Sequence, residues 1–290
     1  MVTSNDAAPR NFSSTNGVAA FWSLARRTAT NLLHWIVALG RAPRTPTPRW
    51  SVTAISAIAV TVAAIVASMF FVDAAATLWG RGLPHWLTES ADEITNFGLS
   101  GKFLYPLGFI LLTLAALMAP SLPATTQGVM AALAARVGFL FVAIAAPSLF
   151  VTVVKRMIGR ARPYVGTHDD PFAYMPFIWR PEYASMPSGH ATTATAAAIA
   201  IGVIWPRTRA VMWLYALTIM LTRVVIIVHH PSDVLAGALV GVIGALLVRR
   251  WFAARRLVFA SDLRPYPDPS WRRLKAVARQ IVAGQPASAN

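Results

Sequence analysis

Residues 51–72 read SVTAISAIAVTVAAIVASMFFV and contain no charged side chain over 22 positions. An α-helix of this length rises about 33 Å, which is enough to cross a hydrocarbon core of about 30 Å. The same character extends through the chain, since 56% of its 290 residues are hydrophobic and only 13% are charged. The sequence therefore predicts an integral membrane protein made of helices rather than a soluble domain.

Five further apolar segments follow this span. Residues 188–205 are rich in Ala and Thr, and residues 233–248 contain three glycines. Small side chains let helices approach closely, so residues 188–205 are placed centrally in a bundle. The predicted fold class is all-α: a polytopic membrane protein with a six-span transmembrane helix bundle and amphipathic interfacial helices. The remaining spans are predicted at about residues 103–119, 137–154 and 210–227.

Basic residues mark the predicted cytoplasmic side. Six arginines precede residue 51, nine basic residues lie from Arg249 onward, and the PRTR stretch at residues 206–209 adds two. Because basic residues concentrate in cytoplasmic flanks, both termini are predicted to be cytoplasmic. The opposite side is expected to carry a mostly acidic set of loop residues: Asp73, Arg81, Glu89, Asp92, Glu93 and Lys102.

The amphipathic segments, the net charge and the lack of cysteine exclude several classes of function. Residues 21–44, 82–102 and 249–259 mix aromatic, aliphatic and charged side chains, which is typical of helices that lie on a membrane. The net charge of +15 is explained by these flanks, so a nucleic-acid site is not indicated. The absence of cysteine excludes disulfides, thiolate metal sites and a cysteine nucleophile.

One predicted outer loop breaks the charge pattern. Residues 155–187 hold five basic residues on the side where topology gives them no purpose. Lysine and arginine that follow a span usually set topology or extend to the membrane interface, but here the side is wrong for topology. These residues are Lys155, Arg156, Arg160, Arg162 and Arg180.

The sequence PSGH at residues 187–190 opens a predicted span. A serine N-cap with proline and glycine as helix punctuation would account for it structurally. A helix N-terminus is also an anion site, because its free N–H groups and the helix dipole point the same way. His190, in that first turn, could exchange a proton with a bound ligand.

The stretch TRVVIIVHHPSDV at residues 222–234 brings an arginine, two histidines and an aspartate together. A helix that begins near His230 places Pro231 in its first turn, where the missing N–H costs nothing. Asp233 then lies one turn from His229, on the same face. Its carboxylate could accept an imidazole N–H and free the other nitrogen to attack. An isolated ion pair between Arg223 and Asp233 is the simpler alternative.

These three motifs, taken in order, carry a resemblance to a known family. The spacings K-x6-R-P (Lys155, Arg162, Pro163), P-S-G-H and R-x5-H-x3-D (Arg223, His229, Asp233) resemble the signature of the type 2 phosphatidic acid phosphatase family of integral membrane lipid phosphatases. Thr222 departs from it, since the family commonly has serine there. The resemblance covers about residues 51–248, expected as a six-span catalytic domain. A basic amphipathic segment (residues 1–50) and a basic tail (residues 249–290) flank it, both cytoplasmic.

The resemblance implies a role for each of these residues. Lys155, Arg162 and Arg223 would hold the phosphate. His229 would attack phosphorus to form a phosphohistidine, and His190 would protonate the leaving group and then act as general base. Asp233 would orient His229, Ser188 and the amide of Gly189 would complete the phosphate cradle, and no metal or cofactor would be needed. His230 is then expected at the surface or beside the site, where it would tune the local charge.

The expected substrate is a lipid-linked phosphomonoester or diphosphate at the outer face of a bacterial cytoplasmic membrane. Undecaprenyl diphosphate, lipid A phosphates, phosphatidylglycerol phosphate and phosphatidic acid all fit the motifs. The partners are therefore this substrate and membrane lipids, and no nucleic acid or obligatory protein partner is indicated.

Three other functions stay open at this stage. Two histidines and an aspartate could ligate zinc, although the five nearby cations oppose it. Vanadium-dependent haloperoxidases resemble this family in the same motifs and hold vanadate in place of phosphate. The predicted membrane spans argue against this chain being such a haloperoxidase. An anion or lipid-phosphate transporter is the non-enzymatic alternative, although transporters place their sites near the bilayer midplane.

Overall fold

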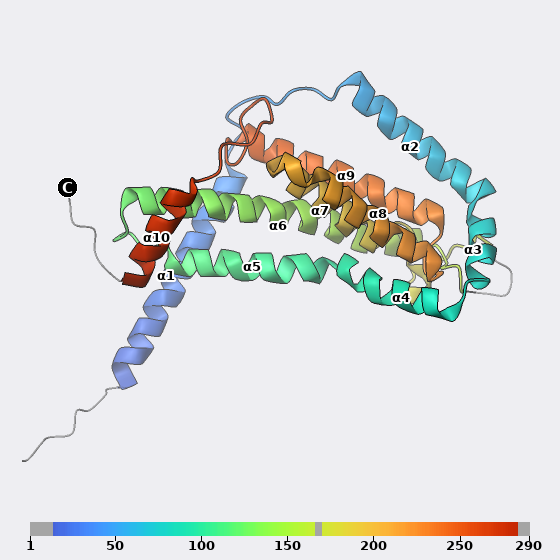
Figure 1. The fold of residues 1–290 in the computed structure, drawn as a ribbon, viewed down its shortest axis with the longest axis horizontal. Helices are drawn as coiled ribbons and strands as arrows, with labels where there is room; N and C mark the ends of the chain where they lie inside the picture. The colour runs from blue at the N-terminus through green and yellow to red at the C-terminus, as the bar shows by residue number, and fades with distance from the viewer. Residues whose placement is uncertain (1–13, 166–169, 284–290) are drawn as a thin grey trace, which may run out of the picture.

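The computed structural model describes residues 14–165 and 170–283, and within these ranges every regular element is a helix. The bundle is elongated, with several long helices running side by side (Figure 1). The all-α prediction is confirmed. The elements in chain order are α1 (Ser14–Gly40), α2 (Val52–Phe71), α3 (Asp73–Arg81), α4 (His85–Thr95), η1 (Asn96–Gly98), α5 (Ser100–Leu117), α6 (Ala124–Ile158), η2 (Pro181–Tyr183), α7 (Gly189–Ile204), η3 (Pro206–Thr208), α8 (Arg209–Val225), α9 (Pro231–Ala254) and α10 (Trp271–Ala283).

Five helical segments in the described residues are long and apolar enough to cross a membrane. The sixth predicted span corresponds to α7, which has only 16 residues and rises about 24 Å. The structure thus supports a membrane bundle, while the count of six rests on this short central helix. The five segments are Val52–Phe71, His85–Leu117, Ala124–Ile158, Pro206–Val225 and Pro231–Ala254.

The short helix α7 lies at the centre, packed against α6, α8 and α9. Its residues Ala196 and Ala200 are fully buried in the main core cluster. Thr192 donates its hydroxyl to the carbonyl of Gly237 on α9 at 2.9 Å. The predicted central position of this Ala- and Thr-rich segment is therefore confirmed, and its small residues bring α7 and α9 close together.

This close approach depends on Gly237. A β-carbon at Gly237 would lie 2.3 Å from the carbonyl oxygen of Ser188. Gly237→Ala should therefore push α9 away from the start of α7 and destabilise the fold by about 1–3 kcal/mol, the usual cost of overpacking. The measurement is the thermal midpoint of the detergent-purified protein.

Gly128→Ala on α6 is the matched control, because nothing lies within 4 Å of a β-carbon at that position. Alanine is favoured over glycine in a helix by about 1 kcal/mol, so this variant should be neutral or stabilised. Equal midpoints for the two variants would contradict the packing argument.

The chain after residue 249 differs from the prediction of an interfacial helix there. Helix α9 continues to Ala254, and the chain then turns back so that Phe259 is fully buried. Phe252 and Phe259 both pack edge-on against Phe139 of α6, with ring centroids 5.4 and 4.8 Å apart from it. The aromatic residues of this segment enter the core because three rings bury more apolar surface there than at an interface.

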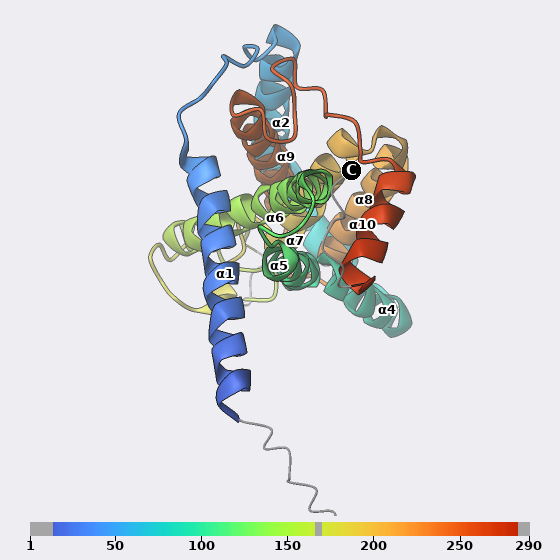
Figure 2. The same cartoon turned by 90° about the vertical axis from the view of Figure 1, so that its left-hand side faces the viewer.

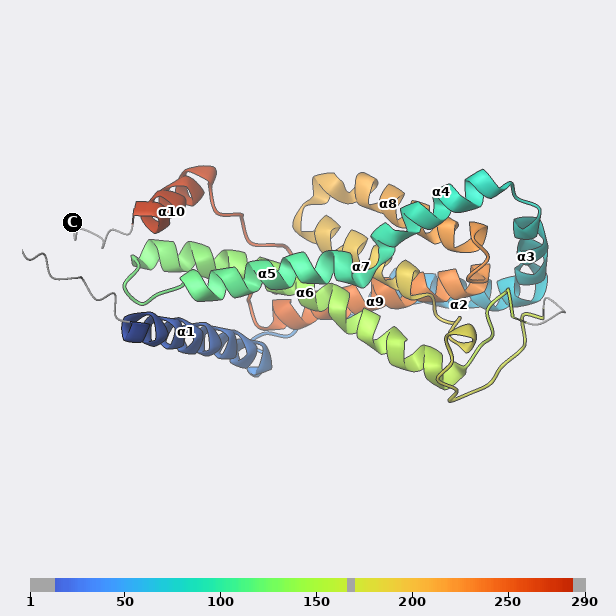
Figure 3. The same ribbon diagram turned by 90° about the horizontal axis from the view of Figure 1, so that it is seen from below.

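The ends of the helices sort into two groups. The C-terminal ends of α6 and α8 and the N-terminal ends of α7 and α9 lie at the same end of the bundle as α3 and α4 (Figures 1 and 3). Helices α1 and α10 lie at the opposite end, on either side of α5 and α6 (Figure 2).

A helix does form within residues 82–102, as predicted, and it is α4.

Candidate active site

Lys155 and Arg162 reach the site from the end of α6. Lys155 lies in the last turn, and Gly159 follows with a φ of 64°, the left-handed conformation that suits glycine. The chain therefore reverses at once, and the N–H of Arg162 donates to the carbonyl of Glu182 at 2.8 Å. This bond fixes the backbone of Arg162 just after the end of α6.

The start of α7 presents free hydrogen-bonding groups. Ser188 is the N-cap residue, but its side chain caps no N–H of the helix. Its hydroxyl is fully buried and has no hydrogen-bond partner among residues 14–165 and 170–283, while its N–H donates to the carbonyl of Asp233 at 2.9 Å. Gly189 has open space where a side chain would stand. The first turn of α7 is thus left open to a ligand on this side.

Arg223 comes from the last turn of α8 and is 6% exposed. One terminal nitrogen of its guanidinium donates to Thr95 of α4 at 2.8 Å, while its Nε has no partner in the part of the chain that the structure describes. The backbone carbonyl of Arg223 accepts the N–H of His229 at 3.3 Å. The turn between α8 and α9 therefore places Arg223 and His229 next to one another.

Asp233 lies between the two histidines. Helix α9 begins at Pro231, as predicted, with His230 as its N-cap. The Nδ1 of His229 is 3.7 Å from Asp233 Oδ2, and the Nδ1 of His230 is 3.4 Å from the same atom. The distance to Asp233 therefore does not select His229 over His230, although the spacing argument predicted that it would. Of the two predicted locations for His230, the surface is wrong, because this residue is 2% exposed, and the location beside the site is confirmed by its contact with Asp233.

Cations surround both His190 and His229. His190 interacts electrostatically with Arg223, His229, Lys155 and Arg162. Burial lowers the pKa of His229 to about 4, with Arg223 and Arg162 adding to the effect and Asp233 opposing it. At neutral pH the imidazole of His229 is therefore uncharged, and its lone pair is available.

Several buried donors around these residues lack partners within the described part of the chain. Among them are the Nε of Arg162, the Nε of Arg223 and the hydroxyl of Ser188, and a terminal nitrogen of Arg156 is also unpaired. Buried polar groups are normally hydrogen-bonded, so a cluster of unpaired donors indicates a ligand that accepts hydrogen bonds. A phosphate offers several anionic oxygens to such donors.

Two residues close to the site were missed by sequence reasoning. Asp73 was expected in an exposed outer loop and Arg160 was one basic residue among five, but both are fully buried. Asp73 follows an uncharged span directly and Arg160 lies two positions before Arg162. An acidic residue at a span end was the available signal, since such residues usually have a partner.

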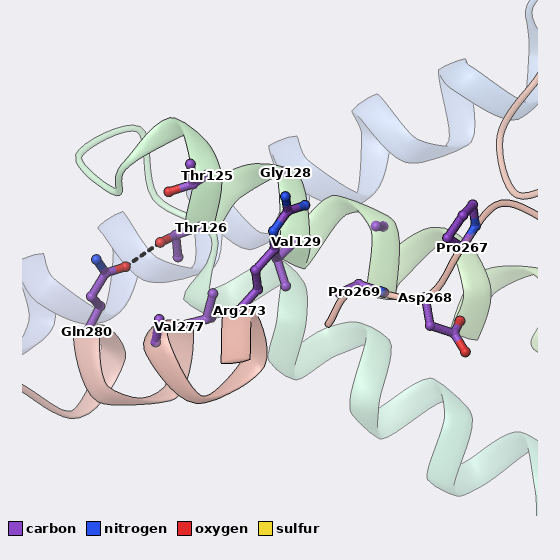
Figure 4. Close-up of a pocket in the computed structure, with 12 residues that line it drawn as sticks. Thr125, Thr126, Gly128, Val129, Pro267, Asp268, Pro269, Arg273, Val277 and Gln280 are labelled. Atoms are coloured by element: carbon purple, nitrogen blue, oxygen red, sulfur yellow. Dashed lines mark hydrogen bonds between the residues drawn. The ribbon is translucent and has the colours of Figure 1, made fainter. Parts of the chain in front are cut away.

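A hollow lies at the other end of the bundle. It is a groove of about 660 Å³ between α6 and the C-terminal segment (Figure 4). Within it, Thr126 donates to Gln280, and the carboxylate of Asp268 accepts from Arg136 at 2.9 Å and from Trp205 at 3.0 Å. None of the eight predicted site residues lines this groove, and its acidic group is already paired.

Comparison with known proteins settles the family. The model of the PAP2 superfamily matches residues 136–257, a range that contains all eight predicted site residues. A lipid A 1-phosphatase from Rhizobium johnstonii is 32% identical over 238 residues, covering 79% of this chain and 91% of that protein. The chain belongs to the PAP2 superfamily.

Two further proteins are similar to this chain. A lipid A 1-phosphatase from Rhizobium etli is 30% identical and covers 79% of this chain and 95% of that protein. The crystal structure of a transmembrane PAP2-type phosphatidylglycerolphosphate phosphatase from Bacillus subtilis aligns with a TM-score of 0.40 and 18% identity, over 77% of this chain and 94% of that one. With its apolar helices, this PAP2 member is an integral membrane lipid phosphatase, as the sequence motifs predicted.

Proposed function

We propose that this phosphatase removes the 1-phosphate of a lipid A-type glycolipid through a phosphohistidine on His229. The support for the substrate is the pair of lipid A 1-phosphatases that match over 91% and 95% of their own lengths. The support for the chemistry is the cluster of unpaired buried donors around a neutral histidine.

In this proposal the phosphate lies between Arg162, Arg223 and the N-terminus of α7. The two free Nε groups and the Ser188 hydroxyl each donate to a phosphate oxygen. The amide of Gly189 adds a backbone donor at the helix N-terminus. Lys155 supplies further positive charge. Together these cations stabilise the negative charge that the phosphoryl group carries in the transition state.

His229 attacks through Nε2, because its Nδ1 faces Asp233 at 3.7 Å and the Ser185 hydroxyl at 3.5 Å. The new bond joins Nε2 to phosphorus, and the bond from phosphorus to the sugar oxygen breaks. His190 protonates that leaving oxygen. A water molecule, activated by His190 as base, then attacks phosphorus and releases inorganic phosphate from His229.

The site is proposed to face the outside of the cytoplasmic membrane. It lies at the end of the bundle opposite α1 and α10 (Figure 1). Basic residues are frequent in the segments at that opposite end, which favours a cytoplasmic location for both chain termini. A lipid headgroup in the outer leaflet would then meet the site directly.

The test is phosphate release from a panel of lipids by the detergent-purified enzyme in the presence of EDTA. The panel holds a lipid A glycolipid with a 1-phosphate, the same glycolipid phosphorylated elsewhere, phosphatidic acid, phosphatidylglycerol phosphate and undecaprenyl diphosphate. We expect the 1-phosphorylated glycolipid to react fastest and EDTA to have no effect.

Loss of activity with EDTA would favour the metal-hydrolase alternative over the phosphohistidine mechanism. Faster reaction of any other lipid in the panel would overturn the substrate assignment. Phosphate release from none of them, with halide oxidation in the presence of vanadate, would indicate a haloperoxidase.

A further inference from the structure

A buried charge network lies directly behind the proposed nucleophile. Arg160 is fully buried between two carboxylates, and it donates to Asp73 at 2.8 Å and to Asp233 at 2.6 Å. It also donates to the Ser232 hydroxyl at 2.6 Å and to the carbonyl of Pro171 at 2.9 Å. One guanidinium thus connects the start of α3, the loop after α6 and the start of α9.

Asp73 is equally well bonded. Its carboxylate accepts hydrogen bonds from Arg160, from the Ser68 hydroxyl at 3.0 Å and from the Ser232 hydroxyl at 2.5 Å. It also accepts the backbone N–H of Ser232 at 3.0 Å. That N–H belongs to the first turn of α9, which has no acceptor within its own helix. Asp73 therefore caps α9 from another helix.

The network sets the orientation of Asp233. One oxygen of this carboxylate, Oδ1, is held by Arg160. The other, Oδ2, accepts from the Ser185 hydroxyl at 2.6 Å and from the N–H of His230 at 2.9 Å, and it faces His229. With both oxygens held, the carboxylate has one position relative to the imidazole of His229.

Such a network persists only when every member is satisfied, because an unpaired buried charge is costly. Arginine suits the position, since its planar fork can bond two carboxylates at once and lysine is a point charge. Burial alone would lower the pKa of Arg160, but Asp233 and Asp73 more than offset this and raise it. Arg160 is therefore charged at every pH at which the enzyme works.

We infer that Asp73 and Arg160 are positioning residues for the phosphatase reaction. They hold Asp233 and the first turn of α9, and through them they hold the ring of His229 in line with the phosphate. Both side chains are fully buried, so they act through other residues rather than on the substrate. This inference rests on the proposed role of His229.

The test compares Asp73→Asn and Arg160→Lys with the wild-type enzyme on the best substrate of the lipid panel. Both variants keep similar size but break the pattern of donors and acceptors. We expect kcat to fall roughly 10- to 100-fold, the usual cost of losing a partner that orients a reacting group. KM should change little, because the phosphate-binding groups are untouched. The rate of phosphoenzyme formation should fall in parallel with kcat.

Matched controls come from exposed residues of the same charge. Glu93→Gln removes an exposed carboxylate on α4, and Arg207→Lys makes the same exchange as Arg160→Lys in an exposed short helix. Both should retain wild-type kcat. Because Asp73 and Arg160 belong to one network, the double variant should lose little more than the worse single variant.

A purely structural role predicts a different result. It would lower the thermal midpoint and the folded yield of both variants but leave kcat per folded molecule unchanged, and that result would overturn the inference. If Asp73→Asn does not fold, Ser232→Ala keeps both charges and removes one hydroxyl, and it must show the same loss of kcat. A wild-type enzyme that hydrolyses no lipid phosphate would instead refute the proposed function.

Discussion

His229→Asn is expected to abolish phosphoenzyme formation and to lower phosphate release by at least about 10⁴-fold, the scale of losing a catalytic nucleophile. The reason is its position. The backbone N–H of His229 donates to the carbonyl of Arg223, and its uncharged imidazole interacts electrostatically with Arg223, Arg162 and His190. The measurement is acid-labile radiolabel retained on the enzyme after brief reaction with a ³²P-labelled lipid phosphate.

His230→Asn is the matched control for this substitution. His230 is the N-cap of α9, and asparagine is among the residues that best fill that position, so the helix should form normally. The variant should still accumulate labelled phosphoenzyme. Label on the His229 variant with none on the His230 variant would mean that the reacting histidine is the one nearer to Asp233, at 3.4 Å.

Span positions were predictable where apolar residues run without interruption. The first span was expected at residues 51–72 and forms as Val52–Phe71. The third was expected to begin after Arg136, but α6 begins at Ala124 and includes this arginine. The guanidinium of Arg136 is satisfied by Asp268 at 2.9 Å and by two carbonyls of the C-terminal segment. A charged residue can lie inside a long helix when it has such partners. The partners of Arg136 lie about 130 positions further along the chain, so the local sequence does not reveal them.

The candidate site was only partly readable from sequence, for a related reason. The motif residues lie at the ends of helices, so their grouping followed from the order of the spans. Asp73 and Arg160 are 87 positions apart, and nothing in the sequence around either one identifies its partner. Their pairing exists because α2 ends beside the start of α9, which is a property of the packed bundle. The Nδ1 atoms of His229 and His230 lie 3.7 and 3.4 Å from the same oxygen of Asp233, so the proposal of His229 rests on the R-x5-H-x3-D spacing rather than on this distance.

Arg162→Lys is expected to lower phosphate release by roughly 10²- to 10³-fold, even though the positive charge is kept. The Nε of Arg162 is buried and has no partner within the described residues, so it is free to donate to a phosphate oxygen beside a second N–H of the same planar group. Lysine cannot supply this two-pronged contact. The measurement is kcat/KM on the best lipid substrate.

Arg156→Lys is the comparison that separates geometry from charge. Arg156 lies in the last turn of α6, six positions before Arg162, and its guanidinium lies 5.9 Å from the centroid of the Trp179 ring. One of its terminal nitrogens is also buried without a partner within the described residues, but Arg156 is not one of the proposed phosphate ligands. Lysine can keep a cation near that ring, so this variant should lose only a small part of its activity. If Arg162→Lys retained near-normal kcat/KM, the phosphate would have to be held by Arg223 and the N-terminus of α7, and the reversal of the chain at Gly159 would serve the fold rather than the substrate.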